Sequence, residues 1–314
     1  MDGSDPICFW QGMVKDFADL SPVYKWVPLN VDKAIGKVKN EFEAGLIQIK
    51  IAVNDKKVNP NVNWKSLDAW KKPPPKRLKS QKIRCFIFQC KDIPSADSDG
   101  ASDPYITLWN PDNKEIKTQV VEDNVNPIFF EALELYYDYD NLADAPPVVL
   151  NLWDHDDALM DSDDFLGRCV VYLQDAAKSY DDTIPEPKWH DIRVGFTDDF
   201  PPCGSMLLSF SIVDDDYNFK VPISYLKLTE EIEYNNFLVE INILGLRNLE
   251  SFGLMPVKKP FIKFNLRSLL PPEKAQAVTN IKTQPSAAGS NPNINTMINF
   301  QIDIPVNPLF CPKL

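Results

Sequence analysis

The chain has 314 residues, 44% of them hydrophobic and 25% charged, which are ordinary values for a globular protein of about two domains. Its net charge of −12 argues against nucleic acid as the main partner, because binding phosphate groups requires a basic surface. No apolar stretch approaches the length of a transmembrane helix, and the N-terminus lacks the basic segment and apolar core of a signal peptide.

Alternating apolar segments, separated by turn residues, recur along the chain and predict short β-strands. The clearest are residues 83–88, 103–108, 128–135, 148–153 and 206–213. Their spacing is typical of a β-sandwich, and no segment shows the sustained period of a long helix. The sequence therefore predicts an all-β fold.

Two internal repeats indicate that the chain contains tandem modules. The segment that begins at Trp189 matches the one that begins at Trp26, and both predict the closing strands of a module. Residues 83–108 align with residues 239–264 at a constant offset of 156, and both predict opening strands. The order of these segments shows which parts of each module the chain contains.

The repeats predict five parts. They are the C-terminal part of a preceding module (1–54), a basic linker that contains prolines (55–80), a complete module (81–214), a second linker (215–235) and the N-terminal part of a following module (236–314). Because the outer modules are incomplete, we expect the chain to be a piece of a longer tandem-repeat protein.

The first linker is strongly basic. Between Lys56 and Arg84, ten residues are basic and one is acidic, a net charge of +9. We interpret this stretch as a solvated linker that Pro73–Pro75 stiffen locally as polyproline II. Contact with anionic lipid, or with an acidic neighbouring domain, is the alternative.

Residue types give little support for catalysis. The six cysteines form no C-x-x-C pair, which predicts free thiols in a reducing compartment. His155 and His190 are the only histidines, so few candidates for a general base exist. The sequence contains no hydrolase, zinc-protease or kinase signature. We therefore expect that the chain is not an enzyme.

Acidic residues gather in two segments that lie between predicted strands of the complete module. The candidate metal ligands are Asp97, Asp103, Asp154, Asp156, Asp163 and Asp164. If the segments are adjacent, their carboxylates repel one another unless a cation binds between them. Calcium fits, because it takes about six to eight oxygen ligands in a flexible geometry, whereas magnesium prefers a stricter octahedron. The alternative is that both segments are solvated turns.

Four motifs in the complete module resemble the C2 domain family. They are Asp97-x5-Asp103-Pro104-Tyr105, Asn126-Pro127, Asp154-His155-Asp156 and Phe165-Leu166-Gly167-Arg168. The array of modules also resembles the ferlin family. The motifs that carry this resemblance are Trp153-Asp154-His155-Asp156, Gly167-Arg168-Cys169 and Leu244-Gly245-Leu246-Arg247-Asn248-Leu249. The resemblance implies tandem C2-type, antiparallel, eight-stranded β-sandwiches. By resemblance, the full-length protein is expected to be anchored on a vesicle or plasma membrane by a C-terminal helix, and the present piece, without that helix, is expected to be soluble.

The resemblance also assigns roles to the acidic residues. The first calcium loop of a C2 domain is matched by Asp97 and Asp103, and the start of the third loop by Asp154 and Asp156. The last ligand is either Asp163 or Asp164, because the loop before Phe165 is longer than in many C2 domains.

The following module departs from this pattern. At the offset of 156, Gly253 and Lys259 take the places of Asp97 and Asp103. A site without its first-loop acids, and with a lysine that repels the ion, cannot hold calcium. We therefore expect residues 236–314 to be independent of calcium.

Two apolar residues, Leu159 and Met160, lie at the expected tip of the third loop. Burying each in the acyl boundary of a membrane would contribute about 1.5–3 kcal/mol once the acids beneath are neutralised. The alternative is that both side chains fold inward onto the loop.

The function predicted from these features is calcium-dependent binding to anionic phospholipid membranes. By resemblance, it would serve vesicle trafficking, exocytosis, membrane fusion or repair on the cytoplasmic face of a vesicle or the plasma membrane. The expected partners are anionic lipid, neighbouring C2 domains of the same chain and proteins of the fusion machinery. The rival hypothesis is a calcium-independent scaffold of C2 domains that binds proteins.

Overall fold

The computed structural model describes the chain in segments, and regular structure within them consists of β-strands and short 3-10 turns. The described residues are 8–14, 24–31, 45–51, 78–96, 101–109, 114–156, 162–228, 232–251, 256–264, 281–286 and 289–311. Within these ranges no helix is long and apolar enough to cross a membrane. The predicted all-β fold class is confirmed.

The strands of the central part are β5 (Lys79–Lys91), β6 (Pro104–Leu108), β7 (Ile116–Lys117), β8 (Ile128–Tyr139), β9 (Val148–Asp154), β10 (Asp164–Val171), β11 (Lys178–Ser179), β12 (Lys188–Ile192) and β13 (Gly204–Asp214). Before them come β1 (Cys8–Phe9), β2 (Lys25–Pro28), β3 (Asn30–Val31) and β4 (Leu46–Ile49), and after them β14 (Tyr234–Gly245), β15 (Lys263–Phe264), β16 (Ile281–Lys282) and β17 (Asn293–Pro305). The 3-10 turns are η5 (Leu142–Asp144), η6 (Ile223–Tyr225) and η8 (Pro308–Phe310).

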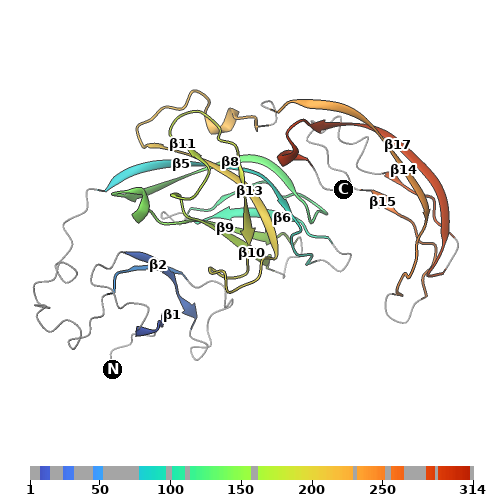
Figure 1. Cartoon of the computed structure of the whole chain (residues 1–314), viewed down its shortest axis with the longest axis horizontal. Coiled ribbons are helices and arrows are strands. Elements are labelled where there is room, and N and C mark those ends of the chain that lie inside the picture. The colour runs from blue at the N-terminus through green and yellow to red at the C-terminus, as the bar shows by residue number, and fades with distance from the viewer. Residues whose placement is uncertain are drawn as a thin grey trace, which may run out of the picture.

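Strands β5 to β13 form a sandwich of two sheets, which occupies the centre of Figure 1. One sheet has the order β10-β9-β6-β7, and the other has the order β11-β13-β5-β8 with β12 also on β13. All pairs are antiparallel except the short β11, which runs parallel to β13. Apart from β11 at one edge, the sandwich therefore has the antiparallel strands expected of a C2 domain.

The core lies between the two sheets and follows from the alternation of side chains along each strand. In β5, Ile83, Cys85 and Ile87 point inward and are fully buried. Leu150 and Leu152 of β9 meet them from the other sheet. The predicted strands at 83–88 and 148–153 lie within β5 and β9 as expected.

Strand β5 contains a β-bulge at Phe88. Ile87 and Gln89 pair with the consecutive residues Leu208 and Leu207 of β13, so Phe88 is the extra residue of β5 in that ladder. The ladder with β8 shifts at the same place, but there the extra residue belongs to β8, since Ile87 and Gln89 pair with Glu131 and Ile128. Because a bulge adds one residue, the inward positions move from Ile87 to Cys90. Phe88 and Gln89 are therefore both available to the outer face of the sheet.

The hairpin of β14 and β17 reproduces the pairing of β5 and β8. Its register also shifts between Ile243 and Gly245, the positions that match Ile87 and Gln89 at the offset of 156. Three hydrogen bonds of the sandwich have an equivalent in this hairpin and its neighbouring strands. The bonds Asp92–Asn126, Ile106–Thr118 and Cys90–Pro127 correspond, in that order, to Asn248–Asn291, Ile262–Thr283 and Leu246–Pro292. We call β14 to β17 the second repeat; it lies at the right of Figure 1.

The hairpin of β2 and β4 likewise resembles that of β12 and β13. Trp26 pairs with Gln48 as Trp189 pairs with Leu207, which agrees with the repeat in the sequence. The division of the whole chain into modules and linkers remains a prediction, since many residues of the first 77 lie outside the described ranges.

All six cysteines are free thiols, as expected. Cys85, Cys90 and Cys169 are fully buried in the core of the sandwich. Burial raises the pKa of all three thiols above its usual value, so they remain protonated and act as small apolar residues.

Candidate functional site

Three strand ends meet at one end of the sandwich and bring the two acidic segments together. Asp154, the last residue of β9, pairs with Pro104 at the start of β6 and with Asp164 at the start of β10. The first and third loops of the sandwich leave from these strand ends. Adjacent loops are what the metal-site prediction requires.

Asp103 and Asp154 are held together through the backbone. The amide of Asp103 donates a hydrogen bond to the carboxylate of Asp154, and the amide of His155 donates to the carbonyl of Asp103 at 3.0 Å. The Asp103 carboxylate accepts the amide of Asp123 at 2.7 Å. Asp154 is only 2% exposed, so the hydrogen bond from the amide of Asp103 helps to compensate a charge that burial disfavours.

Asp163 is held by its own set of hydrogen bonds. Its carboxylate accepts the hydroxyl of Tyr105 and the amide of Asp156, the latter at 3.2 Å. The Nδ1 atom of His155 lies 3.3 Å from the same carboxylate. Partial burial alone would raise the pKa of Asp163, but the hydrogen bonds from Tyr105, Asp156 and His155 outweigh it and hold the pKa below its ordinary value. Asp163 therefore stays ionised at neutral pH.

Asp164 lies differently. It is exposed and pairs directly with Asp154 across β9 and β10. Residues directly opposite in an antiparallel pair point to the same side of the sheet. The register therefore places Asp164 on the face of Asp154, whereas Asp163 precedes the strand and is held by Tyr105 and by the amide of Asp156. Spacing along the sequence could not separate these two residues, because it does not fix the position at which the strand begins.

The remaining site residues lie outside the described residues. They are Asp97, Leu159 and Met160, so neither the first ligand of the first loop nor the apolar tip of the third is placed. Within the described ranges, no group of three or more His, Cys, Asp or Glu is arranged to hold a metal ion. The described acids nevertheless fit calcium by chemistry, since they are carboxylate oxygens on loop ends, the ligands that hard cations prefer.

In the second repeat, the position of Asp103 is taken by Lys259, which precedes Pro260 as Asp103 precedes Pro104. The amide of Ser286 donates to the carbonyl of Pro260 at 2.9 Å, as the amide of Val121 donates to that of Pro104 at 3.0 Å. The second repeat therefore keeps the backbone hydrogen bond beside the first loop, but it has a positive side chain where the sandwich has the negative Asp103.

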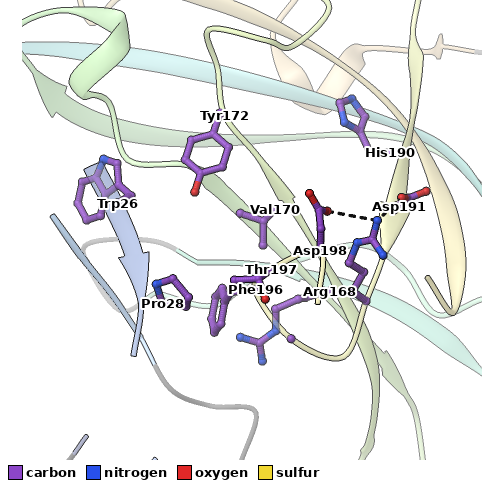
Figure 2. A pocket seen from close by; sticks show the side chains of 12 residues that line it. Trp26, Pro28, Arg168, Val170, Tyr172, His190, Asp191, Phe196, Thr197 and Asp198 are labelled. Atoms are coloured by element: carbon purple, nitrogen blue, oxygen red, sulfur yellow. Dashed lines mark hydrogen bonds and ion pairs between the residues drawn. The ribbon is translucent and has the colours of Figure 1, made fainter. Parts of the chain in front are cut away.

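A separate cavity of about 460 Å³ lies between β2 and the sandwich. Figure 2 shows Trp26 and Pro28 on one side and Arg168 and Phe196 on another. The guanidinium of Arg168 stacks on the ring of Phe196, with 4.1 Å between the guanidinium carbon and the ring centre. Sequence reasoning did not single out this cavity, because it joins residues far apart in the chain.

The charges around the cavity are largely compensated. Arg193 forms ion pairs with Asp191 at 2.6 Å and with Asp198 at 3.3 Å. Partial burial and the neighbouring charge of Lys188 lower the pKa of His190, which keeps its imidazole neutral at pH 7. Such a lining gives no strong preference for one ligand charge.

Comparison with known proteins identifies the central sandwich. Residues 81–192 match the C2 domain family. Human myoferlin is 24% identical over 251 residues, which are 74% of this chain and 11% of that protein. A C2 domain-containing protein of Dictyostelium discoideum is 29% identical over 124 residues, which are 35% of this chain and 60% of that protein. The chain is a C2-domain protein with distant similarity to ferlins over much of its length.

The chain spans about a tenth of the length of the myoferlins that it matches. Among solved structures, the two calcium-bound C2 domains of Extended-Synaptotagmin 2 are 18% identical. That match covers 71% of this chain and 74% of the other, with a TM-score of 0.32.

Proposed function

We propose that the sandwich binds calcium at the loop end formed by β6, β9 and β10 and thereby binds anionic phospholipid membranes. The observation that supports this most directly is the pairing of Asp154 with both Pro104 and Asp164. This pairing gathers carboxylates from two loops at one end of a C2 domain. Oxygen ligands from separate loops suit a cation with flexible coordination.

We assign the ligands as Asp97 and Asp103 from the first loop and Asp154, Asp156 and Asp164 from the third. Asp163 acts as a positioning residue, because its carboxylate fastens the third loop to Tyr105 of β6 and joins the two ends of that loop through His155. Bound calcium would supply the positive charge that cancels the carboxylates and attracts lipid phosphate oxygens. Leu159 and Met160 then enter the acyl boundary and add apolar contact.

The first test measures the thermal stability of the whole chain with and without calcium. A ligand specific to the folded state, present at about 100 times its Kd, stabilises that state by about 2.7 kcal/mol. We expect this gain in the natural chain and none in the variant Asp103→Asn/Asp156→Asn. Anionic vesicles of phosphatidylserine and phosphatidylcholine should strengthen calcium binding, and vesicles of phosphatidylcholine alone should not.

An unchanged melting temperature at millimolar calcium, with or without vesicles, would exclude the calcium site. The protein would then act as a calcium-independent scaffold. Replacing Leu159 and Met160 with serine separates insertion from surface attraction, because it should weaken vesicle binding without changing calcium affinity in solution.

A second test separates the two adjacent aspartates. We expect Asp164→Asn to weaken calcium binding by about tenfold or more, a loss of about 1.4 kcal/mol. Asp163→Asn should change calcium affinity less and lower the stability of the loop instead. Calorimetry on both variants checks the assignment, and the opposite order of effects would assign the ligand to Asp163.

The wider role follows from the similarity to ferlins. We propose that the chain functions as part of a membrane trafficking, fusion or repair protein on the cytoplasmic face of a membrane, through binding and not through catalysis. The second repeat, with Lys259 at the place of Asp103, contributes a calcium-independent module that contacts neighbouring domains or proteins of the fusion machinery.

A further inference from the structure

The outer face of the β5–β8–β13 sheet carries an apolar patch that is covered. Phe86, Phe88, Phe130 and Leu207 are buried there at exposures of 8% or less, on the side of the sheet away from the sandwich core. We call these four residues the docking face. One face of an antiparallel sheet commonly faces water, so a buried second face requires a partner.

One partner is the turn η8 after the second repeat. The ring of Phe310 lies 5.2 Å from that of Phe88 and 5.6 Å from that of Phe130, measured between centroids. The side-chain amide of Gln89, which is 1% exposed, donates to the carbonyl of Leu309 at 2.6 Å. The bulge thus turns two successive residues of β5, Phe88 and Gln89, toward the same turn.

The other partner is the segment after β13, residues 215–228, which we call the strap. Lys82 donates to the carbonyl of Tyr217 at 3.2 Å, and Arg84 donates to that of Val221 at 3.0 Å. Further on, Leu228 is 3% exposed in the cluster of the docking face. The strap therefore follows β5 from Lys82 toward Phe88 and delivers the chain to the start of β14.

The second repeat provides an internal comparison for the docking face. Its inward positions remain apolar, since Val239, Ile241 and Ile243 match Ile83, Cys85 and Ile87. The equivalent outward positions of the second repeat are exposed. They are occupied by Asn242, Leu244, Asn295 and Met297, in place of Phe86, Phe88, Phe130 and Ala132 of the sandwich. The three aromatic rings of the docking face therefore have no counterpart in the second repeat, where two of the four positions are asparagine and all four are exposed.

The backbone conformation of Phe130 is a second observation that points to this contact. Its φ is 50°, and the equivalent Asn295 has a φ of 48°. Asparagine tolerates the left-handed region, whereas a bulky side chain is rare there. The sandwich keeps a phenylalanine at a position where its backbone favours asparagine, and the ring of that phenylalanine packs on Phe310.

We infer that the docking face is an interaction surface for the strap and the Leu309–Phe310 turn of this same chain, so that the sandwich and the second repeat form one rigid unit. The contact needs no metal and is independent of the proposed calcium site. Binding at the sandwich loops would therefore set the orientation of the second repeat.

The test is tryptic cleavage after Lys227 in the whole chain, followed by mass spectrometry. Lys227 is exposed, but its neighbours Leu226 and Leu228 belong to the cluster of the docking face, so cleavage requires the strap to leave the sheet. We expect Phe310→Ala to accelerate this cleavage by about tenfold, in proportion to the open population. Hydrogen exchange in residues 217–228 should rise in parallel.

Phe130→Asn is the second variant, since it installs the residue that the second repeat carries at a left-handed position. It should accelerate cleavage as Phe310→Ala does, and combining the two should add little, because both remove the same contact. Met297→Ala is the control, as Met297 is 60% exposed on the equivalent face of the second repeat. Cleavage at the natural rate in both Phe310→Ala and Phe130→Asn would overturn the inference.

Discussion

At the scale of single residues, Arg84 shows how one side chain serves two parts of the molecule. Its Nη2 atom lies 2.7 Å from the carboxylate of Glu134, and its side chain is 5% exposed. The guanidinium also stacks on Phe219 of the strap, with 3.7 Å between its central carbon and the ring centre. Removing Arg84 leaves Glu134 without its cation and the strap without an anchor.

We therefore expect Arg84→Ala to lower the free energy of unfolding by about 2–3 kcal/mol, below the usual cost of breaking a fully buried pair because Glu134 is 21% exposed. Lys117→Ala is the matched control, since its ion pair with Glu115 is more than half exposed and should change stability by less than about 0.5 kcal/mol. Urea titration of both variants measures the difference. Equal effects would show that Arg84 contributes no more than a surface charge.

At the scale of elements, β10 depends on a glycine. Gly167 has a φ of +151° at a register shift, and a Cβ atom there would lie 2.7 Å from Cγ2 of Ile192. Next to it, Arg168 and Arg193 exchange backbone hydrogen bonds that connect β10 to the end of β12. The glycine thus lets one strand contact both sheets, and it lies three residues after Asp164.

Gly167→Ala should destabilise the protein by about 2–4 kcal/mol through backbone strain and overlap with Ile192. Gly289→Ala isolates the strain, since Gly289 has a φ of +126° with nothing within 4 Å of an added Cβ. We expect about 1 kcal/mol for that control. If denaturation gives similar losses for the two variants, steric overlap at Gly167 is relieved by movement of Ile192.

The strands could be predicted from the sequence, because the alternation of apolar and polar residues is a local pattern. The β-bulge at Phe88 could not be predicted in this way. The alternation at residues 83–88 predicts a strand, and the apolar Phe86 and Phe88 at outward positions are a sign of a covered outer face. Alternation alone does not show where an extra residue enters, because the bulge at Phe88 is defined only by its two neighbouring strands.

At the scale of the whole molecule, the repeats in the sequence predicted that residues 83–108 and 239–264 have equivalent strands, whereas the contacts between the sandwich and the second repeat were not predicted. The offset of 156 placed Lys259 opposite Asp103, and the hydrogen bonds of the two loops agree with that alignment. The contact of Phe88 with Phe310 joins residues more than 200 positions apart, and no local pattern indicates such a pair. The proposal of Asp164 over Asp163 as a ligand likewise rests on the register of β9 and β10, which the sequence alone did not give.

The length of the strap also determines how far the second repeat can move away from the sandwich. While it lies along β5, the start of β14 is held beside the docking face, where Tyr234 packs against the cluster. Because the strap follows the strand, tension on the second repeat would break its contacts one after another, starting near Leu228 and ending at Tyr217. Once peeled away, residues 215–233 could span at most about 60 Å at roughly 3.3 Å per residue, with the sandwich still folded. The same chain could thus hold two modules in contact or let them reach surfaces several nanometres apart.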